Sequence, residues 1–189
     1  NSGDWGDVNN WSIVSHSGAV APRIPGVDDP VVIGDNDSIY LQSDNFAADF
    51  APRNSATLQI ETGSVLDMGN NPSSNFGMVQ SHPNGNGKFK LTVTRATQIE
   101  FDFPDGDFTD FNVNGGTTEF YTIDGRPGMI YILPAAVTSY GNLIMTPLDQ
   151  DNIVLPNNAY TTIYGNLVIN GNRPEAWLTM SWYNATLYT

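Results

Sequence analysis

The chain has 189 residues and no cysteine, and its 20 acidic and 7 basic residues give a formal net charge of −13. A surface this acidic repels phosphate backbones and anionic lipid, so we expect no nucleic-acid partner. No apolar run approaches the ~18 residues that a membrane-spanning helix needs, so we expect no membrane insertion. Without cysteine the chain has no disulfide, no zinc-thiolate site and no thiol nucleophile.

The opening segment carries two tryptophans, Trp5 and Trp11, with little apolar alternation around them. Bulky aromatic side chains can cover the end of a stacked β structure, where open strand edges would otherwise promote aggregation. We therefore expect residues 1–30 to form an N-terminal cap and residues 31–189 to form the coils of a single domain. The last five residues have the pattern of a strand without a closing cap, so we expect the chain to be a piece of a longer protein.

From residue 31 onward, short apolar runs alternate with turn clusters rich in Gly, Asn and Pro. Apolar residues at every second position predict strands with one buried face, and helical periodicity is almost absent. Charged residues make up only 14% of the chain, which also favours strands, because Lys, Glu and Arg are the usual residues of helix surfaces. The predicted strands cover residues 31–33, 38–41, 57–61, 65–68, 89–94, 99–103, 117–123, 129–133, 139–145, 152–155, 160–170 and 177–182.

Internal repetition distinguishes between the possible all-β folds. The tetrapeptide Tyr-Gly-Asn-Leu occurs at residues 140–143 and again at residues 164–167, 24 residues later. Each copy follows an apolar strand that ends in proline, and these residues, Pro134 and Pro156, are 22 apart. A unit of about two dozen residues suits one coil of a solenoid. The sequence therefore predicts an all-β fold, a right-handed parallel β-helix, with a β-sandwich that contains a chance repeat as the alternative.

The repeat also predicts which side chains meet. If successive coils stack in parallel at the usual spacing of about 4.8 Å, Leu143 lies over Leu167 and the aliphatic side chains form a continuous interior column. Asn142 and Asn166 would stack at a bend, where they can hydrogen-bond between coils.

Carboxylates are densest around Gly106, where Asp105, Asp107 and Asp110 form an oxygen-rich loop. Calcium takes 6–8 oxygen ligands, so these three residues are candidate ligands of a structural Ca²⁺ ion. The stretch lacks the spacing and the terminal Glu of an EF-hand loop. A plain structural turn and a catalytic carboxylate are the alternatives, and we expect no cofactor other than this calcium ion.

Catalytic signals are weak elsewhere. His16 and His82 lie in different turn-like regions, and no Ser or Asp partner at a suitable spacing suggests a catalytic triad. Trp177 and Trp182 could stack on sugars if both faced outward. Because an odd separation along a strand places two side chains on opposite faces, packing in the core or at the end is the alternative.

Six kinds of stretch occur in a fixed order along the chain: GDW at 3–5, NWS at 10–12, PGVDDPVVI at 25–33, FPDGDFTDF at 103–111, GGTTEFY at 115–121 and the two Tyr-Gly-Asn-Leu copies. In this order they resemble large secreted, adhesin-like proteins of Bacteroidetes. The resemblance implies a right-handed β-helix in a surface-exposed protein, exported by the type IX secretion system and in some cases serving gliding motility. Thr118, Glu119 and Phe120 replace the commoner Val-Glu-Tyr, and the C-terminal sorting domain of such proteins is not visible.

These observations together predict a function. We expect a non-enzymatic structural or adhesive module of a secreted or cell-surface bacterial protein, located outside the cell. Its expected partners are the secretion machinery, surface glycans or other cell-surface proteins. The alternative is a carbohydrate-binding or carbohydrate-cleaving β-helix protein.

Overall fold

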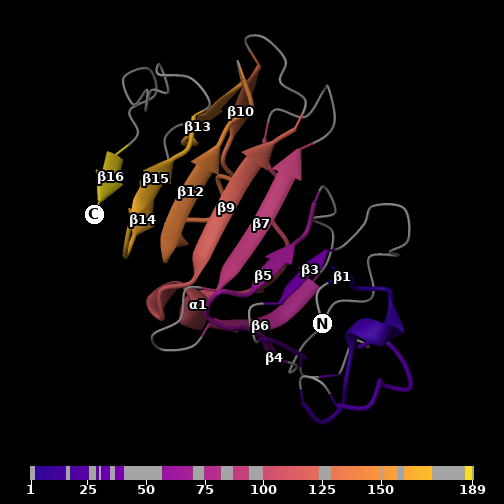
Figure 1. The fold of residues 1–189 in the computed structure, drawn as a ribbon. Helices are drawn as coiled ribbons and strands as arrows, with labels where there is room; N and C mark the ends of the chain where they lie inside the picture. The colour runs from indigo at the N-terminus through magenta and orange to yellow at the C-terminus, as the bar shows by residue number, and fades with distance from the viewer. Residues whose placement is uncertain are drawn as a thin grey trace.

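The computed structural model describes residues 3–15, 18–25, 29, 31–34, 37–40, 57–69, 75–81, 87–93, 100–123, 129–149, 151–156, 160–171 and 186–188. These residues form a parallel β-solenoid, in which strands from successive coils lie side by side in sheets (Figure 1). Every pair of named strands within this part of the chain is parallel. The predicted all-β solenoid is confirmed, and the β-sandwich alternative is wrong.

The largest sheet contains seven strands in the order β1-β3-β5-β7-β9-β12-β15, so its neighbours come from successive passes of the chain. It forms one long wall of the solenoid (Figure 1). Its strands are β1 (Gly3–Asp4), β3 (Ser38–Tyr40), β5 (Val65–Asp67), β7 (Lys88–Val93), β9 (Thr117–Thr122), β12 (Asn142–Thr146) and β15 (Leu167–Ile169).

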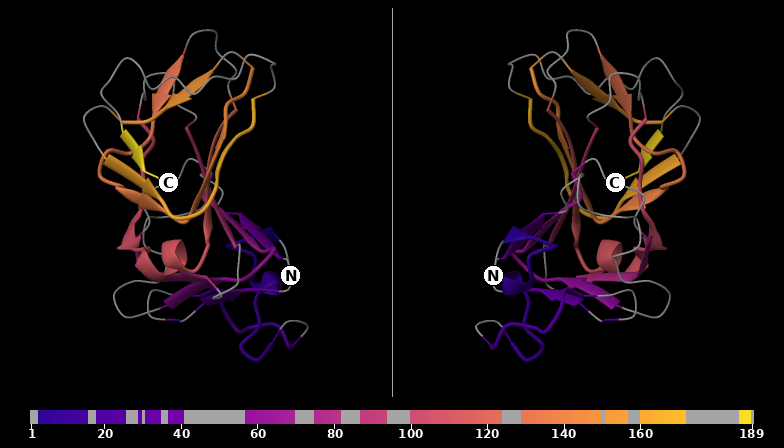
Figure 2. Two further views of the ribbon diagram at one scale, coloured as in Figure 1. Left: turned by 90° about the vertical axis from the view of Figure 1, so that its left-hand side faces the viewer. Right: turned by 90° about the vertical axis from the view of Figure 1, so that its right-hand side faces the viewer.

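Three smaller sheets form the other walls, and Figure 2 shows them facing the large sheet across the interior. The first is four-stranded, and contains β2 (Val31–Ile33), β4 (Thr57–Ile60), β6 (Asn75–Ser81) and β8 (Asp105–Asp107). The second pairs β10 (Ile130–Ile132) with β13 (Asn152–Val154). The third contains β11 (Ser139–Tyr140), β14 (Tyr160–Ile163) and β16 (Thr186–Tyr188).

The register between the last coils confirms the predicted stacking. Leu143 pairs with Leu167 and Ile144 pairs with Val168, at the 24-residue spacing of the tetrapeptide. Tyr131 pairs with Ile153, at the 22-residue spacing of the two prolines. The asparagines of the repeat also meet, because the backbone N–H of Asn166 donates to Oδ1 of Asn142 at 2.9 Å.

The core lies inside the walls, and strands such as β12 alternate buried with partly exposed side chains. In β7, Phe89, Leu91 and Val93 are buried. Aromatic rings from successive coils pack against one another there, with centroids 4.9 Å apart for Phe101 and Phe120. Burying one such side chain contributes about 1.5–3 kcal/mol, so the interior column is the main stabilising feature of each coil.

Two predicted strands are interrupted by corners. The run predicted over residues 139–145 divides into β11 and β12 at Gly141, and the run over residues 160–170 divides into β14 and β15. A Cβ atom on Gly141 would lie 2.4 Å from the carbonyl oxygen of Gly116, so only glycine allows the two coils to approach this closely. A short helix that the sequence did not predict, α1 (Thr109–Val113), follows β8.

The N-terminal end carries a compact aromatic pair. The ring of Trp11 meets that of Trp5 at 4.8 Å in an edge-on arrangement, and Nε1 of Trp11 donates to the Trp5 carbonyl oxygen at 2.7 Å. Trp5 is fully buried. The segment before it already belongs to the large sheet, since β1 pairs with β3. The domain boundary at residue 30, the cap and the right-handed coil stay predictions.

Candidate functional site

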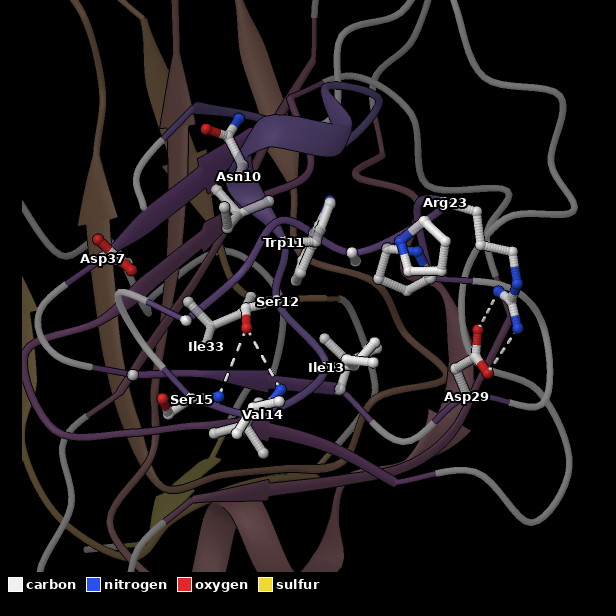
Figure 3. A pocket seen from close by; sticks show the side chains of 18 of the residues that line it. Asn10, Trp11, Ser12, Ile13, Val14, Ser15, Arg23, Asp29, Ile33 and Asp37 are labelled. Atoms are coloured by element: carbon white, nitrogen blue, oxygen red, sulfur yellow. Dashed lines mark hydrogen bonds and ion pairs between the residues drawn. The ribbon is translucent and has the colours of Figure 1, made fainter.

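A pocket of about 660 Å³ lies beside β2, at the N-terminal end of the solenoid (Figure 3). Its walls come from the segment that follows the tryptophan pair and from β2 itself. Both apolar and polar side chains line the pocket. The lining includes Asn10, Trp11, Ser12, Ile13, Val14, Ser15, Ala21, Arg23, Asp29, Val31, Ile33, Asp37, Ile39 and Glu61.

Strand β2 gives this pocket an unusual wall. It is the terminal strand of its sheet, so one of its edges pairs with no other described strand. Val32 of β2 is 58% exposed, and Ile13 and Val14 opposite are each 78% exposed. An open strand edge beside exposed apolar side chains is the kind of surface to which an extended segment can add by main-chain hydrogen bonds.

The rim of the pocket is held by local polar contacts. Arg23 forms a two-nitrogen ion pair with the carboxylate of Asp29, in which Nη2 donates to Oδ1 at 3.0 Å. Hydrogen bonding to Asp29 raises the pKa of Arg23 above its ordinary value. The hydroxyl oxygen of Ser12 accepts from the backbone N–H of Val14 at 3.3 Å and closes a tight turn. These groups shape the rim of the pocket.

A charged cluster lies on the outer face of the seven-stranded sheet. Nζ of Lys88 lies 2.9 Å from Oε2 of Glu119, and Nζ of Lys90 lies 3.7 Å from Oδ2 of Asp67. The hydroxyl of Tyr121 donates to Oδ1 of Asp67 at 2.9 Å. Thr146 of the next strand donates to Oε1 of Glu119, also at 2.9 Å. We call these six residues the outer-face cluster, and it links four successive strands.

The electrostatics of the outer-face cluster follow from these contacts. Burial raises the pKa of Glu119, but hydrogen bonds from Lys88 and Thr146 outweigh it and hold the pKa below its ordinary value. Burial and the neighbouring carboxylate of Asp67 raise the pKa of the Tyr121 hydroxyl. A general acid in glycoside cleavage needs a raised carboxyl pKa, so Glu119 is not suited to that role. The cluster is arranged to hold strands together.

The predicted calcium ligands lie on the opposite side of the fold in an exposed region. Asp105 and Asp107 belong to β8 rather than to a turn, because β8 pairs with β6. Asp107 accepts from the backbone N–H of Thr109 at 2.9 Å, which lowers the pKa of its carboxyl group. Asp110 lies in the first turn of α1. Among the described residues, no three His, Asp or Glu side chains are grouped to hold a metal ion, so the calcium site at Asp105 stays a prediction.

The other candidate residues, His16, His82, Trp177 and Trp182, lie outside the described residues. Sequence reasoning missed both the pocket and the outer-face cluster. Alternation along residues 88–93 and 117–122 could have placed Lys90 and Glu119 on one face. The 24-residue repeat could not have paired Lys90 with Glu119. The coil between β7 and β9 contains α1 and is longer, so these two strands pair at a spacing of 29 residues.

None of the described helices is long and apolar enough to cross a membrane. Comparisons of the chain with protein-family models, with curated proteins and with solved structures gave no match.

Proposed function

We propose that the chain is a non-enzymatic structural and adhesive module of a secreted or cell-surface bacterial protein. The observation that carries this proposal is the seven-stranded parallel sheet. In a solenoid each coil contacts only its neighbours, so the fold extends by stacking and gives an elongated support for binding surfaces. The outer-face cluster adds ion pairs and hydrogen bonds between coils rather than a set of reactive groups.

The finer parts of the proposal rest on different observations. The buried pair of Trp5 and Trp11 supports an N-terminal cap, because it fills the end of the solenoid beside β1. The right-handed coil, the bacteroidetal origin, export by the type IX secretion system and a role in gliding motility are supported by the sequence resemblance alone. The proposed partners are the secretion machinery, surface glycans or other cell-surface proteins.

Adhesion is the property to test. The purified chain is fixed to beads, and the beads retained under flow are counted on bacterial cells and on immobilised polysaccharides. We expect retention that depends on the apolar side chains beside the pocket, so that the double substitution Ile13→Ser and Val14→Ser reduces it. The matched control is Val113→Ser, because Val113 is 62% exposed but lies on α1. Equal loss in both variants, or no retention by the unaltered chain, would contradict the proposal.

The same preparations also test for catalysis. They are incubated with the polysaccharide panel, and new reducing ends or unsaturated products are measured. We expect none above the level of a heat-denatured sample. Cleavage by the unaltered chain above that level would replace the structural proposal with an enzymatic one.

A carbohydrate-binding role is the second candidate, and one observation favours it. Tyr160, the first residue of β14, is 68% exposed, and Tyr164, in the bend directly after β14, is 60% exposed; Thr161 and Ile163 between them are buried. Two exposed aromatic rings four residues apart in the chain can stack on separate sugar units of a glycan.

Glycan affinity electrophoresis separates the two candidates. For a glycan-binding protein we expect Tyr160→Ala with Tyr164→Ala to weaken retardation in a neutral polysaccharide gel by roughly tenfold in dissociation constant. Tyr40→Ala is the control, because Tyr40 is 45% exposed on the large sheet. Unchanged migration of the unaltered chain in every polysaccharide would remove the carbohydrate-binding candidate.

A further inference from the structure

One buried carboxylate has no use in the function proposed above. Asp151, the residue before β13, is only 6% exposed, and neither of its carboxylate oxygens has a hydrogen-bond partner. Side chains alternate along this stretch, with Asp151 and Ile153 buried and Asn152 exposed between them, so Asp151 points toward the interior. Buried charges in proteins are paired with an opposite charge or coordinate a metal ion, because an isolated one is strongly destabilising.

Among the described residues, Asp151 takes part in no ion pair. The basic residues nearest to it in the sequence, Arg126 and Arg173, both lie outside the described part of the chain. The backbone N–H of Asp151 donates to the carbonyl oxygen of Leu148 at 3.0 Å, which closes a turn around the exposed Asp149. A second carboxylate is thus held in the same turn, two residues from the first.

A neutral oxygen from the preceding coil lies against the same turn. The hydroxyl oxygen of Thr122, which is buried, accepts from the backbone N–H of Leu148 at 2.8 Å. Two carboxylates together with hydroxyl, carbonyl and water oxygens are the ligand type that hard cations prefer. Ca²⁺ suits an irregular turn better than Mg²⁺ does, because Mg²⁺ demands near-ideal octahedral geometry.

We propose that the turn between β12 and β13 binds a hard divalent cation, Ca²⁺ by its chemistry, and that Asp151 is the anchoring ligand. Asp149 supplies the second negative charge, and neutral oxygens complete the shell. The ion compensates the buried carboxylate and fixes the corner at which the chain passes from the large sheet to the β10–β13 wall. The site is distinct from the exposed Asp105 and Asp107 of β8.

Thermal unfolding with and without calcium tests the proposal. The whole chain is freed of metal with EDTA, dialysed and unfolded in the presence of increasing CaCl₂. Because an ion that binds only the folded state stabilises it by mass action, we expect Tm to rise by roughly 5–10 °C at a hundredfold excess over Kd. Isothermal titration with CaCl₂ should give one ion per chain at this site.

Isosteric variants locate the ion. Asp151→Asn should abolish the calcium-dependent rise in Tm while leaving the metal-free protein at least as stable as the unaltered chain. Asp7→Asn, at an exposed carboxylate of the N-terminal segment, is the matched control and should keep the full rise. If Asp151→Asn does not fold, Asp149→Asn is used in the titration, where a Kd weakened by roughly tenfold or more is expected, since it removes one of two charged ligands.

Three results would overturn the proposal. The first is a Tm that calcium does not change, together with no heat of binding. The second is a full calcium response in folded Asp151→Asn. The third is the absence of a calcium response combined with a large loss of stability in Arg126→Gln or Arg173→Gln, which would make that arginine the partner of the buried carboxylate.

Discussion

The two copies of Tyr-Gly-Asn-Leu occupy successive coils of the solenoid but have different environments. Tyr140 is 1% exposed and packs edge-on against Phe120, with ring centroids 5.9 Å apart, and burial raises its pKa. Tyr164, at the equivalent place in the second copy, is 60% exposed. The asparagines and leucines of the two copies are nevertheless stacked on each other in successive coils, whereas the two tyrosines are not.

The cause is a change of register by one residue. β12 pairs with β15 at a spacing of 24 residues, whereas β11 pairs with β14 at a spacing of 23, so that Tyr140 lies beside Ile163. Because side chains alternate along a strand, a shift of one residue exchanges the inner and outer faces. Ile163 takes the interior place in the second coil and Tyr164 turns outward. Two residues of a sequence repeat occupy equivalent places only where the paired strands are offset by the repeat length, here 24 residues.

The tyrosines should show the largest difference between the copies. Tyr140→Ala leaves a cavity in the core and should lower the free energy of unfolding by about 3–5 kcal/mol. Tyr164→Ala removes an exposed ring and should change it by less than about 0.5 kcal/mol. Urea unfolding of both variants checks this. Similar losses at the two positions would mean that the rings occupy equivalent places.

Alanine substitution of the two glycines should give a smaller difference in the free energy of unfolding. A Cβ atom at Gly141 would lie 2.4 and 2.6 Å from the carbonyl oxygens of Gly116 and Asn112, which the backbone cannot move aside. Gly141→Ala should therefore destabilise the fold by about 3 kcal/mol. At Gly165 the nearest atom is Oδ1 of the Asn142 side chain, so Gly165→Ala should lower the free energy of unfolding by about 1 kcal/mol. Equal effects in chemical unfolding would refute the close approach at the first corner.

Alanine substitution of the two asparagines should give a still smaller difference in the free energy of unfolding. Asn142 donates to the carbonyl oxygen of Gly115 at 2.8 Å and accepts from the backbone N–H of Asn166, so it joins three coils. Asn142→Ala should lower the free energy of unfolding by about 1–2 kcal/mol, because both partners lose a hydrogen bond. Asn166 makes only a 3.4 Å contact through its side chain, and Asn166→Ala should be worth less than about 0.5 kcal/mol. The reverse order would contradict this assignment.

The smallest expected effect has the opposite sign. The hydroxyl of Tyr140 is buried and has no hydrogen-bond partner. Tyr140→Phe removes an unsatisfied polar group, so the free energy of unfolding should stay the same or rise by up to about 1 kcal/mol. Tyr164→Phe is the exposed control. A clear loss of stability in Tyr140→Phe alone, measured by urea unfolding, would reveal a partner for this hydroxyl.

Much of the fold could be predicted from the sequence because the solenoid is built from local signals. Alternation of apolar residues predicted most strands, and the repeats predicted two of the three described registers between the two coils that carry the tetrapeptide. The third, between β11 and β14, depends on the conformation of the corner at Gly141, which no repeat of residue types reports. Likewise β8 was missed because exposed aspartates with a glycine favour turns, and only pairing with β6 makes them a strand.

The candidate sites were harder to predict because they depend on contacts between coils. Asp105 and Asp107 stand out in the sequence by their density, yet both side chains are exposed. Asp151 does not stand out, and its importance comes from burial without a partner. The pocket beside β2 depends on how the segment after Trp11 folds back against a strand edge, and no short motif encodes that arrangement.

The in-register stacking of successive coils is the central claim, and a cysteine pair tests it directly. The natural chain has no cysteine, so Ile144→Cys with Val168→Cys gives a clean background. These residues pair across β12 and β15, and adjacent strands lie about 4.8 Å apart, within the range that a disulfide bridges. We predict rapid loss of both thiols within the monomer on mild oxidation, and little with Ile144→Cys and Asn170→Cys. Oxidation of the second pair but not the first would contradict the register and the solenoid account built on it.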